Sequence, residues 1–241
     1  MQKRWVGWLM LLAVVTLAVP VAAAGWQKVG AKEVRQMMQS EDPLVVFPLS
    51  RIEFNNLHIE GSVNIPLSQL EGGLPSDKNR KLVFYCLGTK CTASPSAADK
   101  AVALGYRNVY AFIEGLPGWI REGYPTRTIE RLPLTSIRTL SPERLKQKLN
   151  DDPQTVLIDI RQKHDLSKGR INHSRTVMIP LDDLIERLSE IPRDAEVVVC
   201  CQKGKRGPTA VRYLAGKGYS KVSCLRGGVK GWEQAGLPMM H

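Results

Sequence analysis

Two parts of this 241-residue chain repeat one pattern of residues. The sequence GYRNV at positions 105–109 is matched by GYSKV at positions 218–222. The run KLVFYC at 81–86 has its counterpart in EVVVCC at 196–201. A repeat of about 105 residues is long enough for each copy to bury a core of its own, so the sequence predicts two domains.

Each copy shows the same order of predicted elements. Helices are expected at 32–39 and 142–149, strands at 44–47, 155–158, 109–112 and 222–225, helical pieces at 182–189, and a last helix around Trp119 or Trp232. Strands that alternate with helices are typical of a mainly parallel sheet covered on both faces. The predicted fold class is therefore α/β, with two tandem domains that are each a mainly parallel sheet flanked by helices.

The limits of the two domains follow from the repeat. The first domain is expected at 25–127 and the second at 139–241. Residues 128–138 between them are polar, include a proline and lack periodicity, which indicates a linker.

The start of the chain has the pattern of a secretory signal peptide. A basic pair at 3–4 precedes an apolar run at 5–19, and three alanines at 22–24 offer a cleavage site, so Gly25 is the expected first mature residue. The alternative is an uncleaved anchor, because the apolar run approaches the lower limit for a membrane span. We therefore expect residues 1–24 to direct export, either to the periplasm or to the outer face of the inner membrane if the segment stays uncleaved.

The chain is basic, with a formal net charge of +11. Such a balance is compatible with nucleic acid, a membrane surface or small anionic substrates. Export argues against nucleic acid, and no run of five or more basic residues appears. A solvated basic surface and a small anionic partner remain, and a membrane partner is expected only if the signal segment is uncleaved.

The cysteines and histidines give no indication of a metal site or of another cofactor. The five cysteines are Cys86, Cys91, Cys200, Cys201 and Cys224, and their spacings match no zinc ribbon or finger. The four histidines form no ligand-like cluster. An odd number of cysteines leaves at least one thiol without an intramolecular partner.

The region around Cys201 has the pattern of a thiolate site. The β-branched run VVV at 197–199 leads through Cys200 to Cys201, and the loop QKGKRG then leads into a helical pattern from Pro208. Cys201 is therefore expected at the tip of a strand, in a loop that opens into a helix N-terminus. Such a position favours a thiolate and binds anions, which indicates a nucleophilic cysteine.

Together with the duplication, this loop, the Asp-Ile-Arg turn at 159–161 and the ending at 226–232 make the chain resemble a tandem rhodanese-like protein. The resemblance covers nearly everything after residue 24. It implies a sulfurtransferase of the thiosulfate sulfurtransferase type. The loop cysteine of such an enzyme takes a sulfane sulfur from thiosulfate or a similar anionic donor, such as a polysulfide. It holds the sulfur as a persulfide and passes it to a thiophilic acceptor, which is cyanide, a small thiol or a protein.

The resemblance assigns roles to individual residues. Cys201 is the implied nucleophile, and Asp159 and Arg161 are expected as a structural pair beside the loop. The implied substrate-binding residues are those that follow Cys201, namely Gln202, Lys203, Gly204, Lys205 and Arg206. An inert buried thiol is the alternative for Cys201, but inert cysteines lack such a cationic loop. Cys200 is expected to be a small core residue.

The first copy departs from the family pattern. Phe-Pro-Leu at 47–49 replaces the expected aspartate and arginine, and the loop CLGTKCTAS at 86–94 carries a cysteine where arginine is expected. Cys86 is the second candidate nucleophile and Cys91 its candidate resolving partner. Three interpretations stay open: a second active sulfur site, a Cys86–Cys91 redox pair, and a degenerate domain that mainly packs.

Other functions compete with sulfur transfer. Cysteine-dependent phosphatases use five residues between cysteine and arginine, whereas only residues 202–205 separate Cys201 from Arg206, so the loop is too small for that chemistry. A non-enzymatic persulfide carrier or sensor, or a redox module that docks on a partner, is the main alternative. The donor also stays open among thiosulfate, polysulfide and mercaptopyruvate, with the first two preferred.

Overall fold

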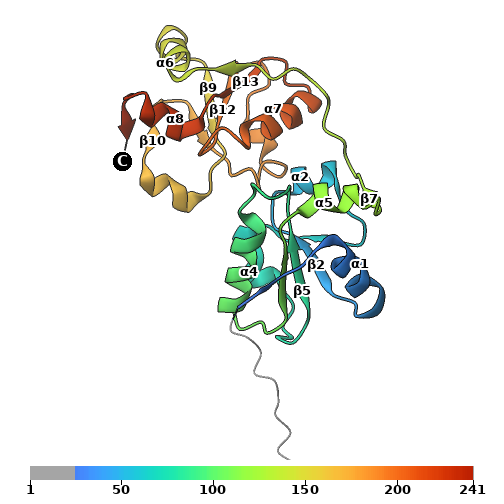
Figure 1. Ribbon diagram of the computed structural model, residues 1–241. Helices are drawn as coiled ribbons and strands as arrows, with labels where there is room; N and C mark the ends of the chain where they lie inside the picture. Colours follow the sequence, from blue (N-terminus) through green and yellow to red (C-terminus); the bar gives the residue numbers. More distant parts are fainter. Residues whose placement is uncertain (1–24, 241) are drawn as a thin grey trace, which may run out of the picture.

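The computed structural model describes residues 25–240, and the structural statements below concern that part of the chain. It contains two α/β units that follow one another (Figure 1). The predicted signal peptide lies outside the described residues. Between residues 25 and 240 no helix is both long and apolar enough to cross a membrane.

The first unit is built on a five-stranded parallel sheet in the order β1-β6-β5-β2-β4. Its strands are β1 (Gln27–Lys28), β2 (Leu44–Phe47), β4 (Val63–Asn64), β5 (Leu82–Tyr85) and β6 (Val109–Phe112). Its helices are α1 (Ala31–Ser40), α2 (Arg51–Asn56), α3 (Leu70–Gly73), α4 (Ala93–Ala103) and α5 (Gly115–Arg121), with a 3-10 turn at Leu67–Gln69. An antiparallel ribbon of β3 (His58–Ile59) and β7 (Thr126–Arg127) lies beside the sheet.

The second unit has a five-stranded parallel sheet in the order β11-β9-β12-β13-β8. Its strands are β8 (Thr139–Leu140), β9 (Val156–Asp159), β11 (Thr176–Met178), β12 (Val197–Cys200) and β13 (Val222–Leu225). Its helices are α6 (Pro142–Asp151), α7 (Gly207–Gly216) and α8 (Gly228–Gln234), with 3-10 helices at Lys163–Lys168 and Leu188–Glu190. An antiparallel ribbon joins β10 (Arg170–Ile171) to β14 (Met239–Met240).

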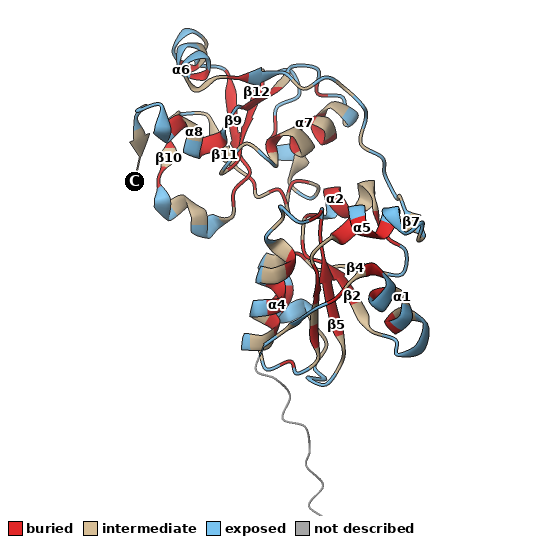
Figure 2. Cartoon of the chain, viewed as in Figure 1, coloured by how far each residue is buried: buried red, intermediate tan, exposed pale blue. Residues whose placement is uncertain are grey.

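The two sheets share one topology. Read from β4 in the first unit and from β11 in the second, corresponding strands follow each other in the same order, and β5 and β12 occupy the central position. Figure 2 shows the central strands buried and α6 largely exposed. The predicted fold class of two tandem α/β domains with parallel sheets is therefore confirmed.

The structure also tests the predicted elements. The strands at 44–47, 109–112 and 222–225 lie where they were expected, and the strand predicted at 155–158 begins one residue later. The irregular stretch with small helical pieces predicted to include 182–189 is seen as turns that lead into the short 3-10 helix at Leu188–Glu190. The buried side chains of Leu181 and Leu184 hold this segment on the core.

The strand β12 divides its side chains between the two faces of its sheet. Val197 and Val199 belong to one apolar cluster, and Val198 and Cys200 belong to the cluster on the other face. Cys201 continues the alternation and lies in the first of these clusters. The neighbouring thiols of Cys200 and Cys201 therefore face opposite sides of the sheet.

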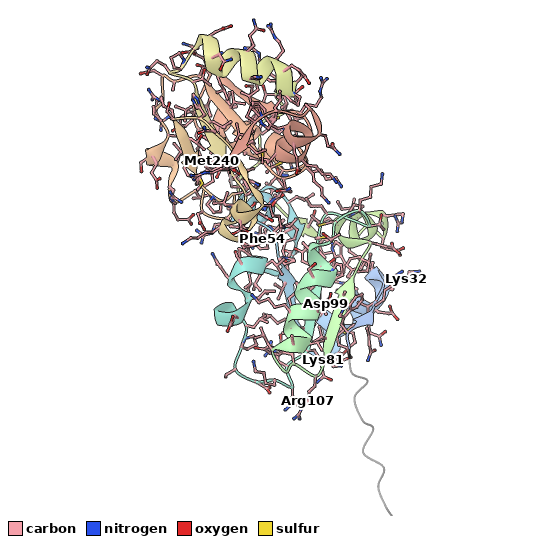
Figure 3. All side chains as sticks on the ribbon, turned by 90° about the vertical axis from the view of Figure 1, so that its left-hand side faces the viewer. Lys32, Phe54, Lys81, Asp99, Arg107 and Met240 are labelled. Atoms are coloured by element: carbon pink, nitrogen blue, oxygen red, sulfur yellow. The ribbon has the colours of Figure 1, made fainter. Side chains whose placement is uncertain are left out.

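The two domains meet through α2, which packs against α7 of the second domain (Figure 1). Ile52 of α2 is buried in the apolar cluster of the second domain, whereas Phe54 belongs to the core of the first. In Figure 3, Phe54 marks the junction between the two units. One short helix therefore supplies side chains to both cores.

Candidate active site

The nucleophile predicted from the sequence, Cys201, lies directly after the central strand of the second sheet. Its side chain is almost fully buried, with 5% exposed, and residues 202–206 connect it to the start of α7 at Gly207. The carboxyl edge of a parallel sheet is the usual place for a ligand in this fold class. The chain thus presents a thiol at the edge where an α/β protein binds its substrate.

The start of α8 holds the loop by its backbone. The carbonyl of Cys201 accepts a hydrogen bond from the N–H of Val229 (2.8 Å), and that of Gln202 accepts one from the N–H of Lys230 (3.0 Å). Gly228 makes this contact possible, because a Cβ there would lie 2.0 Å from the Cys201 oxygen and 2.6 Å from the amide nitrogen of Gly204. Two carbonyl oxygens of the loop are therefore bound to α8 and are not free to repel an anion at the thiol.

An ion pair fixes the side of the loop that faces β9. Arg161 donates to both carboxylate oxygens of Asp159, at 2.7 to 3.0 Å, and both side chains are nearly inaccessible to solvent. The same guanidinium donates to the side-chain oxygen of Gln202 at 3.2 Å. Burial opposes the charge of Arg161, but the hydrogen bonds and the charge of Asp159 raise its pKa. Arg161 thus stays charged and holds Gln202, the first residue after Cys201.

Arg206 has a different setting from the one its role as a substrate ligand implies. Its Nη2 lies 3.2 Å from the carboxylate of Glu53, in α2 of the first domain, and 3.1 Å from that of Asp182. Asp182 also accepts hydrogen bonds from Gln162 and Ser68. The Nε of Arg206 is buried and makes no hydrogen bond to residues 25–240. The charge of Arg206 is therefore largely neutralised by carboxylates from both domains.

The two lysines of the loop remain available. Lys203 and Lys205 are exposed and make no ion pair with any residue in the described part of the chain. These two ammonium groups are the charges of the loop that can attract an anion over a distance.

Two other thiols near the loop are held in the neutral form. Burial raises the pKa of Cys200, and the charge of Asp159 raises it further. Burial, and then the proximity of Cys201, raise the pKa of Cys224 to about 11. Both groups are thus protonated at neutral pH and are poor nucleophiles.

The first domain keeps the same backbone arrangement around Cys86. The carbonyl of Cys86 accepts a hydrogen bond from the N–H of Leu116 (2.9 Å), and a Cβ on Gly115 would lie 2.0 Å from that oxygen. The loop at 87–92 then leads into α4. The backbone hydrogen bond and the closely packed glycine that shape the Cys201 loop are therefore preserved in the first copy.

The side chains around Cys86 differ from those around Cys201. Its thiol is fully buried and lies 3.5 Å from the hydroxyl of Ser94, and the Cys91 thiol is within hydrogen-bonding reach. The hydrogen bond from Cys91 outweighs burial and, helped by Ser94, lowers the pKa of Cys86 to about 6. The pKa of Cys91 is raised correspondingly, because its proton is held by Cys86. Both thiols are free in this structure.

Apolar packing replaces the ion pair beside the first loop. Phe47, which ends β2, packs against Tyr85 with ring centroids 5.2 Å apart. Tyr85 occupies the place of Cys200, and its hydroxyl bonds to the backbone N–H of Ile59 (3.0 Å) and to Ser62. The first copy is therefore held by aromatic contacts where the second uses Asp159 and Arg161.

Comparison with known proteins gives the family. A profile described as "Rhodanese-like domain" matches residues 30–122 and 141–235. The chain belongs to the rhodanese family. The prediction of two tandem rhodanese-like domains is confirmed, and the matched segments lie inside the predicted domain limits of 25–127 and 139–241.

Two curated relatives match about two fifths of the chain each, and one solved structure matches most of it. A protein named "Sulfurtransferase" from Allochromatium vinosum is 36% identical over 104 residues, which are 43% of this chain and 95% of that protein. "Thiosulfate sulfurtransferase GlpE" from Ectopseudomonas mendocina is 28% identical over 100 residues, which are 42% of this chain and 88% of that protein. A crystal structure of thiosulfate sulfurtransferase from Pseudomonas aeruginosa covers 89% of this chain and 43% of its own, with 22% identity and a TM-score of 0.43.

The structure brings together most of the site residues predicted for the second rhodanese domain. Gln202 contacts Arg161, and Arg161 contacts Asp159, so these three form one connected group beside Cys201. Reasoning from sequence missed Glu53, because nothing local in the first domain signals a contact with Arg206. It also missed Ser94, whose hydroxyl lies beside the Cys86 thiol.

Proposed function

We propose that this rhodanese is a sulfurtransferase that carries a sulfane sulfur as a persulfide on Cys201. The observation that carries the proposal is the Cys201 loop, in which the thiol follows the central strand and two carbonyls are bound to α8. Rhodanese-like domains and relatives named as sulfurtransferases support sulfur transfer in general terms. Lys203 and Lys205 support an anionic donor, for which thiosulfate or a polysulfide is our choice.

The proposed reaction has two displacement steps. The thiolate of Cys201 attacks the outer sulfur of thiosulfate, the S–S bond breaks, and sulfite leaves with the electron pair. An acceptor thiolate or cyanide then attacks the outer sulfur of the persulfide and regenerates the Cys201 thiolate. Lys203 and Lys205 attract the donor and counter the charge of the departing sulfite. Arg161 keeps Gln202 in place beside the reacting sulfur.

A persulfide carrier with slow turnover is the second candidate. The setting of Arg206 favours it, because a guanidinium that is paired with Glu53 and Asp182 contributes little to stabilising the leaving sulfite. Such a protein would hold its sulfur until a partner protein docks.

The assay for the leading proposal is thiocyanate formation from thiosulfate and cyanide. Cys201→Ser is expected to lower turnover by at least about a hundredfold, because the serine hydroxyl cannot form a persulfide. Cys224→Ser is the matched control, since that thiol is buried and protonated, and most of the activity is expected to remain. Undiminished turnover in Cys201→Ser would rule the proposal out.

The carrier proposal has its own readout. Mass spectrometry of the protein after exposure to thiosulfate and removal of the excess would show one added sulfur on Cys201 under either proposal. Negligible turnover with cyanide and with small thiols would then identify the carrier.

We also propose that the protein acts outside the cytoplasm. The basic pair and the apolar run at the start of the sequence support export. Deletion of residues 2–24 is expected to move the protein from the envelope fraction to the cytoplasm. Cell fractionation of the full chain and of the deletion variant measures this change. An unchanged distribution would contradict export.

A further inference from the structure

The first rhodanese domain holds a pair of cysteines that the proposed function does not use. The Cys86 carbonyl is bound by α5 in the same way as the Cys201 carbonyl is bound by α8, so the loop around Cys86 retains the form of a reactive site. This loop has lost the arginine and gained a second thiol. Its chemistry should therefore differ from that of Cys201.

The backbone of the loop folds Cys91 back onto Cys86. The N–H of Cys91 donates to the carbonyl of Gly88 at 2.9 Å, which closes a turn between the two cysteines. The turn leaves the Cys91 carbonyl oxygen 3.7 Å from the Cys86 sulfur, so the backbone of Cys91 lies against the Cys86 thiol. Cys86 and Cys91 thus lie on one short loop between β5 and α4, and a disulfide between them would close within that loop.

The two thiols have different access to solvent. Cys86 is fully buried, whereas Cys91 is partly exposed at the outside of the loop. A hollow of about 460 Å³ lies against the same loop and is lined by residues 87–90, Glu114, Pro117 and Arg121. Lys90 in this lining is exposed and makes no ion pair with residues 25–240, so the hollow offers a cation to a small anionic sulfur compound.

We propose that Cys86 and Cys91 form a second active site that reduces a sulfane sulfur to hydrosulfide. The Cys86 thiolate first attacks the terminal sulfur of a polysulfide or a low-molecular-weight persulfide. The donor's S–S bond breaks, and the rest of the donor leaves as a polysulfide shortened by one sulfur or as a thiolate. The sulfur of Cys91 then attacks the inner sulfur of the Cys86 persulfide. The bond between the two persulfide sulfurs breaks, and the outer sulfur leaves as HS⁻ with the proton of Cys91.

The step is balanced in atoms and electrons. The sulfane sulfur gains two electrons, and the two cysteines lose them as they join in the Cys86–Cys91 disulfide. A dithiol reductant, by thiol–disulfide exchange, returns the pair to its reduced state. The thiol of Cys91 thus takes the place that the missing arginine would have filled: it holds the anion at Cys86 and supplies the proton for the leaving group.

The test uses the full chain with Cys201→Ser, so that no sulfur passes through the second domain. This protein is loaded with inorganic tetrasulfide, freed of excess reagent and followed without reductant. About one hydrosulfide per chain is expected, together with a Cys86–Cys91 disulfide in a peptide map made under non-reducing conditions.

Variants of the pair separate the two steps. Adding Cys91→Ser should leave the extra sulfur on Cys86 and slow hydrosulfide release by at least about tenfold, because serine cannot form the disulfide. Adding Cys86→Ser should prevent loading of this loop. Cys91→Ala is a second variant in case serine disturbs folding, and Cys224→Ser is the matched control expected to behave like the parent.

Three results would overturn the proposal. They are equal hydrosulfide release after Cys91→Ser or Cys91→Ala, release without a Cys86–Cys91 disulfide, and no sulfur on Cys86 after loading of the folded Cys91 variants. Because Cys201 is absent from every protein in this series, none of these results bears on the sulfurtransferase proposal. That proposal is read from thiocyanate formation by a Cys86→Ser protein in which Cys201 is intact.

Discussion

Gly228 shapes the Cys201 loop by having no side chain. Its backbone lies in the left-handed region at φ +64, and a Cβ would overlap the Cys201 carbonyl oxygen and the amide nitrogen of Gly204. Both obstacles are backbone atoms, which cannot move aside as the end of a flexible side chain can. Glycine is thus required both by the turn and by the close approach.

We expect Gly228→Ala to destabilise the protein by about 2–4 kcal/mol and to abolish most of the turnover, because the loop must shift away from α8. Gly236→Ala is the matched control. Gly236 has nearly the same φ, +65, but a Cβ there meets no atom within 4 Å. Urea unfolding of the two variants separates the overlap from the backbone strain. Equal losses of stability would show that the contact with Cys201 is unimportant.

At the scale of elements, the site depends on where strands end. β9 ends on Asp159 and β12 on Cys200, and these two residues are paired in register. The ion pair of Asp159 with Arg161 therefore lies next to the start of the Cys201 loop. Because both charges are buried, breaking this ion pair lowers the free energy of unfolding more than breaking an exposed ion pair would.

We expect Arg161→Lys to lower the free energy of unfolding by about 2–4 kcal/mol. A lysine cannot bind both oxygens of Asp159 and reach Gln202 as well. Turnover should fall too, since Gln202 loses its partner. Arg170→Lys is the control, because the side-chain hydrogen bonds of Arg170 within residues 25–240 go to the sulfurs of Met178 and Met240, both at 3.9 Å. Chemical denaturation and the thiocyanate assay measure both effects. Similar values for the two variants would contradict a special role for Arg161.

The elements that the sequence predicts well are those set by local pattern. The apolar runs at 44–47, 109–112 and 222–225 are buried on both faces, so composition alone marks them as strands. The segment at 182–189 was predicted only as an irregular stretch with small helical pieces, because its exact shape depends on contacts with distant residues such as Ser68 and Arg206.

The candidate site also has a part that local sequence predicts and a part that it does not. The position of Cys201 at a strand tip is local and follows from the chain itself. The pairing of Arg206 with Glu53 joins residues far apart in sequence, and no local pattern encodes it.

On the scale of the whole molecule, the first domain contributes directly to the loop of the second. One carboxylate oxygen of Glu53 accepts from the backbone and hydroxyl of Ser50, which caps the start of α2, and from Arg206. The exposed pair of Arg51 and Glu186 adds a second link between the domains at 2.9 Å. The position of α2 and the charge available at the Cys201 loop are therefore coupled.

We expect Glu53→Gln to destabilise the protein by about 1–3 kcal/mol, because the start of α2 loses a negative charge and Arg206 loses one of two carboxylates. The same change should lower KM for thiosulfate, since more positive charge becomes available to the donor. Glu186→Gln removes only an exposed ion pair and should cost less than about 1 kcal/mol, with KM unchanged. Steady-state kinetics and thermal unfolding provide the readouts. An unchanged KM in Glu53→Gln would show that Arg206 does not take part in donor binding.

The position of Ile52 has a consequence for the history of the duplicated chain. This side chain of the first domain is 2% exposed and completes the apolar interior of the second. Separating the two domains would remove Ile52 and expose that interior to water, whatever chemistry the first domain performs. The first copy can therefore change or lose its own reactivity and still be retained, because its twin no longer folds around a complete core without it.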